Sequence, residues 1–344
     1  MKLINLKLAA AALAAVGTLA ALPAHAGKTL DGIKSRGQII CGVSTGVNGF
    51  SAADSNGKWS GLDVDVCKAL AAATLGDAEK VKYVPLTSQQ RFTALQSGEV
   101  DLLARNTTFT LTRDASLGLS STVVNYYDGQ GFMVPVKSKL KNPKQLKGQT
   151  VCVQSGTTSE KNLASFSKAY GLNLKPVVFE KFEAANAAYF SGRCVAYTTD
   201  ASGLASIRSK EAKDPKEHVI LPDLISKEPL GPTVRRGDDE WFAIVKWVMY
   251  GLLEAEEYGV TQANVEQMKS STDPVVQRLL GVGNEDTGKL LGLDKEWLAR
   301  AIKATGNYGE SFERNVGLKS SVGLPRGLNN LWNNGGLMYA YPVR

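Results

Sequence analysis

The sequence is poor in histidine. Only two of its 344 residues are His; His25 falls in an N-terminal leader, and His218 stands beside a charged stretch that is expected on the surface. One histidine is too few for a His-based zinc site, and it removes most familiar catalytic triads. Phosphate-binding Gly-rich loops, the dinucleotide fingerprint and the nucleophile elbow are also missing. We therefore expect no enzyme activity, no cofactor and no metal.

Long apolar runs are also lacking, apart from a short one near the N-terminus. Lys2 and Lys7 flank an apolar stretch that ends at Ala21, and small residues stand at Ala24 and Ala26. The run is about 15 residues long, short of the ~20 that span a bilayer. This pattern predicts a signal peptide over residues 1–26, cleaved after Ala26. The alternative is an uncleaved membrane anchor.

Cysteine is scarce, and export changes how the four residues are interpreted. An oxidising compartment favours structural disulfides over reactive thiols, and the close CxxC spacing of a zinc ribbon is absent. Two local bridges, Cys41–Cys67 and Cys152–Cys194, would each stay inside one lobe. Spacing alone leaves three pairings open, and free buried thiols are an alternative.

Charge is mixed rather than segregated. The formal net charge is +7, from 40 Lys and Arg against 33 Asp and Glu. Residues 208–217 interleave both signs, as on a solvated face, and no basic block alternates with aromatics, so nucleic-acid binding is not expected. The chain left after leader removal is longer than one core usually serves, which predicts two lobes.

The hydrophobic pattern alternates between strands and helices. Strands are expected over residues 38–44, 80–85 and 100–104, and helices over 62–72 and up to Leu95, the latter capped by Ser88. The pattern restarts with strands at 147–153, 175–179 and 193–197 and a helix at 159–170, before helices at 241–257 and 274–280. This predicts an α/β protein with mostly parallel sheets. Lobe 1 would comprise residues 27–127 and 231–344, lobe 2 residues 128–230, and the hinge crossings lie near 126–128 and 227–231.

Polar residues follow several expected strands, where open α/β sheets bind ligands. Arg113 and Thr108 lie in the loop after strand 100–104, and an arginine grips a carboxylate with two parallel hydrogen bonds. Thr158 opens a helix whose N–H groups suit an anion. Asp200 supplies the opposite charge after strand 193–197. Singly, Arg113 could be a surface arginine and Asp200 a helix cap; together they suit a zwitterion.

These residues resemble the amino-acid-binding proteins of bacterial ABC importers, the family 3 extracellular solute-binding proteins. The markers are residues 61–66, 98–103, 110–113 and 156–158 together with Asp200. The resemblance implies a type II periplasmic-binding-protein fold, with two lobes joined by two hinge strands and closing on the ligand. It also implies a periplasmic monomer that delivers free L-amino acids to an inner-membrane ABC permease.

The resemblance assigns roles to individual residues. Arg113 and the Thr158 N–H would hold the ligand α-carboxylate, with Thr157 beside it. Thr108, the Asn106 carbonyl and Asp200 would hold the α-ammonium. The side-chain pocket is expected from Ser44, Val47, Phe50 and Trp59. Because Ser44 and Val47 stand where binders of basic amino acids tend to carry an acidic residue and a tyrosine, strict selectivity for basic ligands is not expected.

The segment after Trp297 extends beyond the usual compact family pattern. It resembles the subgroup that binds general L-amino acids, which implies a broad ligand range; the alternative is a loop that only packs over one lobe. Two other functions stay open. One is a secreted dehydratase-like enzyme on the same scaffold, since fold does not fix function. The other is a ligand-binding module for a sensory receptor.

Overall fold

The computed structural model describes residues 28–344. The predicted signal peptide and its cleavage after Ala26 lie outside these residues. In the described part of the chain, no helix combines the length and apolarity needed to cross a membrane.

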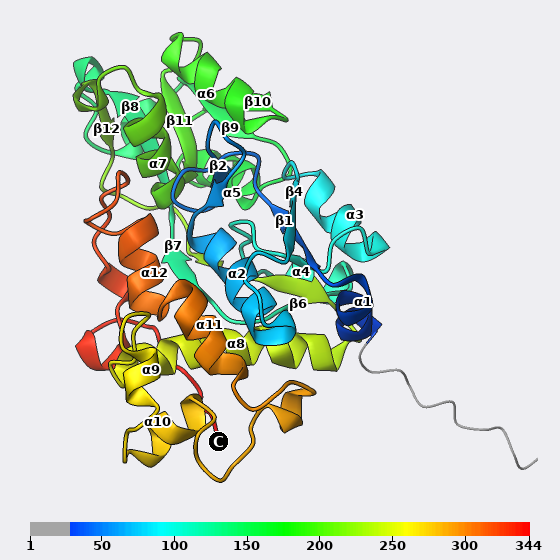
Figure 1. The fold of residues 1–344 in the computed structure, drawn as a ribbon. Coiled ribbons are helices and arrows are strands. Elements are labelled where there is room, and N and C mark those ends of the chain that lie inside the picture. Colours follow the sequence, from blue (N-terminus) through cyan, green and yellow to red (C-terminus); the bar gives the residue numbers. More distant parts are fainter. Residues whose placement is uncertain (1–27) are drawn as a thin grey trace, which may run out of the picture.

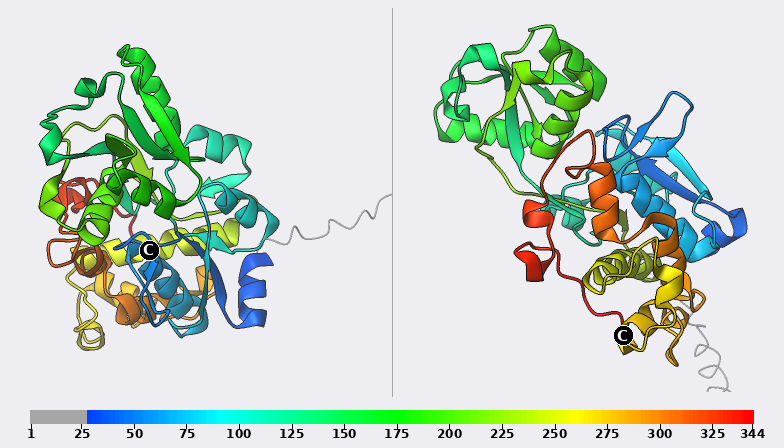
Figure 2. Two further views of the ribbon diagram at one scale, coloured as in Figure 1. Left: turned by 90° about the horizontal axis from the view of Figure 1, so that it is seen from above. Right: turned by 60° about the vertical axis from the view of Figure 1, so that its left-hand side comes forward.

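Two lobes, each built on a five-stranded sheet, make up the described chain (Figures 1 and 2). Lobe 1 carries the first sheet, in which β1 pairs in parallel with both β4 and β5, and β14 runs antiparallel between β5 and β6. Its strand order is β4 (Val81–Pro85), β1 (Ile39–Val43), β5 (Leu102–Leu103), β14 (Thr233–Arg235) and β6 (Leu119–Ser121).

Lobe 2 carries the second sheet. Here β9 pairs in parallel with β10 and β11, while β8 runs antiparallel to β11 and β12. The order is β10 (Lys175–Phe179), β9 (Thr150–Gln154), β11 (Ala196–Asp200), β8 (Gln130–Pro135) and β12 (His218–Ile220). The strand expected over 193–197 lies three residues further on, because antiparallel pairing with β8 fixes its register.

The two lobes are joined by a pair of antiparallel strands. β7 (Tyr126–Asp128) leads from lobe 1 into lobe 2, and β13 (Glu228–Leu230) returns. These are the two hinge strands expected from the sequence. Their pairing places Asp128 opposite Glu228 at the lobe 2 end of the hinge. A small hairpin of β2 (Ala52–Ala53) and β3 (Trp59–Ser60) completes the strands of lobe 1.

Helices cover both sheets, and the C-terminal third of the chain packs on lobe 1 (Figure 1). The longest, α8, begins where the Asp238 side chain accepts a hydrogen bond from Trp241 N, a normal N-cap. The helices are α1 (Lys28–Arg36), α2 (Leu62–Leu75), α3 (Gln90–Ser97), α4 (Leu111–Ser116), α5 (Thr158–Ala169), α6 (Phe182–Phe190), α7 (Ala201–Glu211), α8 (Asp239–Glu257), α9 (Val265–Met268), α10 (Pro274–Leu279), α11 (Trp297–Thr305) and α12 (Tyr308–Asn315). Short 3-10 turns are η1 (Val136–Ser138), η2 (Pro143–Leu146), η3 (Pro215–Glu217), η4 (Lys289–Leu291), η5 (Gly327–Asn329) and η6 (Trp332–Asn334).

The C-terminal segment belongs to the lobe 1 core rather than lying loosely over it. Leu331, Met338 and Val343 are buried in the same cluster as Trp241 and Trp297. Removing large apolar side chains from water is the main stabilising contribution of such a cluster. The segment after Trp297 is therefore an integral part of lobe 1.

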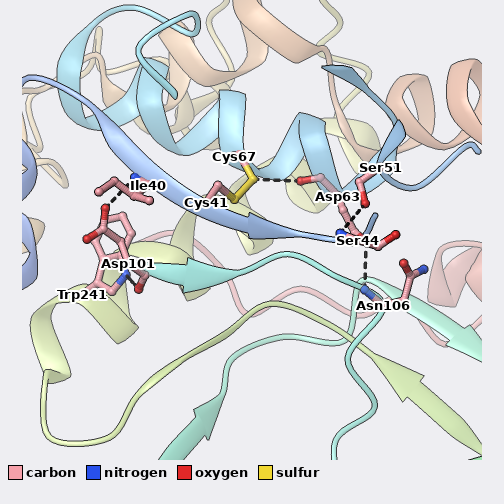
Figure 3. Close-up of a disulfide and its surroundings, with 9 residues drawn as sticks. All are labelled: Ile40, Cys41, Ser44, Ser51, Asp63, Cys67, Asp101, Asn106 and Trp241. Atoms are coloured by element: carbon pink, nitrogen blue, oxygen red, sulfur yellow. Dashed lines mark hydrogen bonds between the residues drawn. A yellow bond between two sulfur atoms is a disulfide. The ribbon is translucent and has the colours of Figure 1, made fainter. Parts of the chain in front are cut away.

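Both local disulfides are present. Cys41 is joined to Cys67, and Cys152 to Cys194. The first ties β1 to α2 within lobe 1 (Figure 3), and the second joins β9 to the turn before β11 within lobe 2. The local pairing expected from the sequence is confirmed, and the alternative of free thiols is wrong.

Two local expectations are wrong. His218 is half-buried instead of exposed, because edge strand β12 packs it against Tyr189 and Phe190, and its Nδ1 lies 2.8 Å from the Tyr189 hydroxyl. This burial lowers the pKa of His218. Ser88 does not cap α3, which begins after Gln89; its hydroxyl donates instead to Gln154 of lobe 2.

Candidate functional site

A polar cavity lies in the cleft between the two lobes. Lobe 1 lines it with the end of β1, the loop after β4 and the loop after β5, and lobe 2 with the N-terminal ends of α5, α6 and α7. The lining comprises Ser44, Thr45, Val47, Ser88, Arg91, Arg105, Asn106, Thr108, Gln154, Thr157, Thr158, Ser159, Phe182, Thr199, Asp200, Ser202 and Gly203. Of the residues expected to hold the two α-groups of a ligand, all except Arg113 line this cavity: Asn106 and Thr108 from lobe 1, and Thr157, Thr158 and Asp200 from lobe 2.

The loop after β5 places the lobe 1 groups. Asn106 adopts a left-handed backbone with φ of 43°, which asparagine tolerates better than most residues. The buried Asp63 carboxyl accepts from its N–H at 3.0 Å and holds this turn (Figure 3). Burial raises the pKa of Asp63 to about 7. The Asn106 carbonyl, which accepts from Arg91 Nη1, and the Thr108 side chain are brought to the cavity by this turn.

Arg113 stands directly behind Thr108. Its Nη1 donates to the Thr108 carbonyl at 2.7 Å, and its guanidinium lies 4.9 Å from the centre of the Phe92 ring. Arg113 is 8% exposed, so it is not a surface arginine. Burial lowers its pKa, while Glu228 and Asp200 across the cleft raise it. A guanidinium keeps its charge in proteins, so Arg113 brings a fixed cation to the site.

The N-terminus of α5 faces the same cavity from lobe 2. Thr157 is its N-cap and accepts from Glu160 N at 3.1 Å while donating to the Gln154 carbonyl. The hydroxyl of Thr157 is therefore committed to lobe 2 backbone. Gly156 adopts φ of 71°, and a Cβ there would lie 2.8 Å from Gln89 Cγ of lobe 1. Glycine allows the two lobes to approach at this point.

Asp200 lines the cavity, and the carboxylates of Asp128 and Glu228 lie near it. Asp200 is the last residue of β11 and stands at the N-cap position of α7, but its side chain makes no capping hydrogen bond. Burial together with repulsion from Asp128 and Glu228 raises the pKa of Asp200 well above its ordinary value. Asp128 accepts from the N–H and hydroxyl of Ser202, and burial raises its pKa to about 6. A cation placed here would be stabilised by all three.

Arg91 and Arg105 also line the cavity, and neither was expected from the sequence. Arg105 is anchored by the Leu86 carbonyl and the Ser88 hydroxyl, and burial lowers its pKa to about 10. Arg91 is 3% exposed, and its Nε has no hydrogen-bond partner among residues 28–344. Its position in the helix is the signal that could have identified it. Arg91, Ala94 and Leu95 share the buried face of α3, and a charged side chain is costly to bury unless it has a partner or a ligand.

The lobes touch beside the cavity. Ser88 donates to Gln154 Oε1 at 3.1 Å, and Gln89 donates to the Ser155 hydroxyl at 3.1 Å. The Thr108 and Thr158 hydroxyl oxygens are 3.4 Å apart. These direct contacts are made between side chains of opposite lobes, so the described conformation has its lobes in contact around the cleft.

The four residues expected in the side-chain pocket divide into two pairs. Ser44 and Val47 line the cavity. Phe50 is instead buried in the lobe 1 core, 5.3 Å from the Tyr126 ring, and Trp59 stacks on Tyr83. Neither aromatic residue is among those that line the cavity. The cavity lining beside Ser44 and Val47 is therefore mainly polar.

These features define an α/β protein whose two lobes place opposite charges in the cleft between them. Residues 39–264 match the family model described as "Bacterial extracellular solute-binding proteins, family 3". The match covers more than half of the chain, so the protein belongs to this family.

Individual relatives resemble the chain over nearly its full length. It is 54% identical over 340 residues to the general L-amino acid-binding periplasmic protein AapJ of Rhizobium johnstonii, covering 98% of this chain and 99% of that protein. It is also 54% identical to the glutamate/glutamine/aspartate/asparagine-binding protein BztA of Rhodobacter capsulatus, covering 95% and 97%. A structure of a periplasmic binding protein from Brucella ovis with glutathione bound superposes with a TM-score of 0.90 at 54% identity, covering 92% of this chain and 99% of that chain.

Proposed function

We propose that this protein is the periplasmic substrate-binding component of an amino-acid ABC importer and takes a broad range of free L-amino acids. The observation that carries the proposal is the cleft itself, which brings the Arg113 guanidinium behind Thr108 of lobe 1 together with the N-terminus of α5 and the buried Asp200 carboxyl of lobe 2. Similarity to AapJ and BztA over nearly their whole length supports both amino-acid binding and breadth. The protein is exported by a leader cleaved after Ala26 and acts as a monomer that engages a membrane permease.

The proposed contacts follow the two charges of an amino acid. Arg113 and the Thr158 N–H hold the α-carboxylate, since a guanidinium and a helix N-terminus both favour an anion. Thr108, the Asn106 carbonyl and Asp200 hold the α-ammonium. Thr157 contributes by capping α5 rather than through a free hydroxyl.

Arg91 extends the proposal to the ligand side chain. Its Nε lacks a partner within residues 28–344, and its side chain lines the same cavity as Ser44 and Val47. A buried donor of this kind is costly until it finds an acceptor. We therefore expect ligands with a carboxylate or amide side chain, such as glutamate and glutamine, to bind more tightly than alanine or valine.

Closure would couple binding to transport. The moving units are residues 27–127 with 231–344 and residues 128–230, which rotate about β7 and β13. A ligand that bridges Arg113 and Asp200 contacts both units only when the lobes are together, so it stabilises the closed form. That closed form is the one that the permease recognises.

The test is calorimetric titration of purified, ligand-stripped protein with the twenty L-amino acids. Tight binding of several, with glutamate and glutamine among the tightest, is expected. A single tight ligand would contradict the broad range, and no binding at all would contradict the function.

Glutathione is a second candidate ligand because of the Brucella ovis structure. Its γ-glutamyl end carries the α-ammonium and α-carboxylate of a free amino acid. Arg113 and Asp200 would therefore hold this end as they hold a free amino acid, while the rest of the peptide extends from the cleft. Adding glutathione to the titration decides the point. Competition between glutathione and L-glutamate is expected if both use Arg113 and Asp200.

The enzyme and receptor alternatives are tested in the same preparation. The chain belongs to a family of solute-binding proteins, which favours ligand binding over an enzymatic reaction. Conversion of prephenate without amino-acid binding would instead support a dehydratase. Copurification with a sensor kinase rather than a permease would support the receptor module.

A further inference from the structure

Glu228, on hinge strand β13, is a buried carboxylate surrounded by donors. It is 1% exposed. Its Oε1 accepts from Asn162 Nδ2 at 2.8 Å and from Ser226 Oγ at 2.6 Å, and its Oε2 accepts from Thr158 Oγ1 at 2.8 Å. An ionised carboxylate only accepts hydrogen bonds, and an amide nitrogen only donates. The side chain of Glu228 therefore acts as the acceptor in all three contacts.

This contact fixes the direction of the hydroxyl of Thr158. A threonine has one hydroxyl hydrogen and two acceptor lone pairs, and here the hydrogen goes to Glu228. The Thr108 oxygen lies 3.4 Å from the Thr158 oxygen across the cleft. Since Thr158 has already used its hydrogen, Thr108 must donate in that contact. Both hydroxyls are then left with lone pairs and no hydrogen for the ligand.

We propose that Glu228 is a positioning residue that, through Thr158 and Thr108, turns both cleft hydroxyls into acceptors for the ligand ammonium. The inference rests on the proposed function and deepens it. A hydroxyl that can rotate would meet an ammonium or a carboxylate equally well. Because Glu228 fixes both hydroxyl hydrogens, the two threonine oxygens can only accept from the ligand, as the α-ammonium next to Asp200 requires. The α-carboxylate is left to Arg113 and the Thr158 N–H.

The same residue also ties the hinge to the site. Thr158 and Asn162 lie four residues apart on α5 and therefore on one face of the helix. Both donate to Glu228, so the first turn of α5 is attached to β13. Opposite it in the hinge, Asp128 accepts from Ser202 in the first turn of α7. Each hinge strand thus holds the start of one lobe 2 helix that borders the cavity.

The replacement Glu228→Gln keeps the shape of the side chain but reverses the direction of its hydrogen bond with Thr158. Its amide oxygen would remain opposite the two donors Asn162 and Ser226, which places its NH₂ against Thr158. Thr158 would then accept from Gln and turn its hydrogen toward the ligand ammonium. We expect the affinity for L-glutamate to fall by about tenfold or more, the scale for a lost charged hydrogen-bond partner.

A double-mutant cycle with Thr158→Val separates this role from a general structural one. Valine keeps the backbone N–H but has no hydroxyl, so in that background Glu228→Gln should lower L-glutamate affinity clearly less than it does in the wild type, leaving only the effect of the lost carboxylate charge. Glu254→Gln is the matched control: Glu254 is also buried, but it accepts from Val343 N in lobe 1, far from the cleft in the chain and fold. Thermal unfolding confirms that each variant is folded.

The outcomes are distinct. Wild-type affinity in Glu228→Gln, or an equal loss with and without the Thr158 hydroxyl, would overturn the inference while the proposed function stands. Failure of the wild type to bind L-glutamate or any other amino acid would overturn both. If Glu228→Gln does not fold, Thr158→Ser against Thr158→Val carries the test: serine keeps a hydroxyl that can donate to Glu228 and should bind L-glutamate about tenfold more tightly than valine does, and equal affinities would overturn the inference.

Discussion

The side-chain amide of Asn329 pairs with both backbone groups of Tyr127 in the first hinge strand. Its Oδ1 accepts from Tyr127 N at 2.6 Å, and its Nδ2 donates to the Tyr127 carbonyl at 3.1 Å. Asn329 lies in η5 of the C-terminal segment, 202 residues further along the chain. The amide occupies the place that a third hinge strand would take, so the C-terminal segment braces the hinge.

Replacing Asn329 with alanine should destabilise the protein. Tyr127 N–H and C=O would both lose their partners beside a buried side chain, at a cost of about 1–3 kcal/mol in the free energy of unfolding. Chemical denaturation measures the loss. The neighbouring Asn330→Ala is the control, because Asn330 is half-buried and its side chain bonds only to the Asn334 carbonyl and Leu331 N within its own turn. An equal free energy of unfolding in the two variants would show that the hydrogen bonds of Asn329 to Tyr127 do not stabilise the protein.

Arg113→Ala should weaken amino-acid binding by at least about 2–3 kcal/mol, because the α-carboxylate would lose its charged partner in a desolvated cleft. Arg113→Lys keeps the charge but not the two-pronged geometry, and an intermediate loss is expected. Calorimetric titration measures both. Arg193→Ala, which removes an exposed arginine of lobe 2, is the control. Unchanged affinity in Arg113→Ala would exclude it from the clamp.

The raised pKa of Asp200 predicts pH-dependent binding. In the empty cleft the carboxyl holds its proton above the ordinary carboxyl pKa of about 4, and an incoming ammonium favours the ionised form. Binding therefore releases a proton, and affinity rises as the pH increases from about 4 through the raised pKa of Asp200. L-Glutamine suits the measurement because its side chain does not titrate.

The released proton is measured by calorimetry in two buffers of different ionisation enthalpy. Asp200→Asn should bind more weakly and lose most of the pH dependence, with Asp128, whose pKa is raised to about 6, accounting for the remainder. An affinity that falls as the pH rises over this range would contradict the role given to Asp200.

Each disulfide should stabilise its own lobe. The bridges close loops of 26 and 42 residues, for which the chain-entropy estimate is on the order of 3–4 kcal/mol each. Replacing Cys152 and Cys194 by alanine should lower the denaturation midpoint of lobe 2 more than that of lobe 1, and reductant should then act only through Cys41–Cys67. An unfolding midpoint that reductant leaves unchanged in the wild type would contradict a stabilising role.

Features set by local pattern could be predicted from the sequence. The helix from Leu62 and the strand at Lys175–Phe179 follow directly from apolar periodicity, and the hinge strands were placed by the restart of the βα pattern. The register of β11 was missed because it depends on antiparallel pairing with β8, which is distant in the chain. Pairings of this kind are decided by tertiary structure rather than by local composition.

In the candidate site, too, residues with a local sequence signal were predicted and residues placed by distant contacts were not. Thr108, Thr158 and Asp200 end or follow regular elements, and the structure gathers them in one cavity. Phe50 and Trp59 pack against Tyr126 and Tyr83 instead of lining the cavity, and these partners are distant in the chain, so local composition does not predict where the two aromatics point. Glu228 gave no local signal, since its role comes from contacts with Thr158 and Asn162, about 70 residues earlier in the chain.

The most direct test of the account uses three ligands that differ only at the α-carbon. L-Glutamate carries both α-groups, 4-aminobutyrate lacks the α-carboxylate, and glutarate lacks the α-ammonium. If Arg113 and Asp200 clamp opposite ends of one zwitterion, calorimetry will show binding of L-glutamate and a loss of at least about 2–3 kcal/mol for each analogue. Comparable affinity for all three would contradict the zwitterion clamp and the amino-acid-binding function built on it.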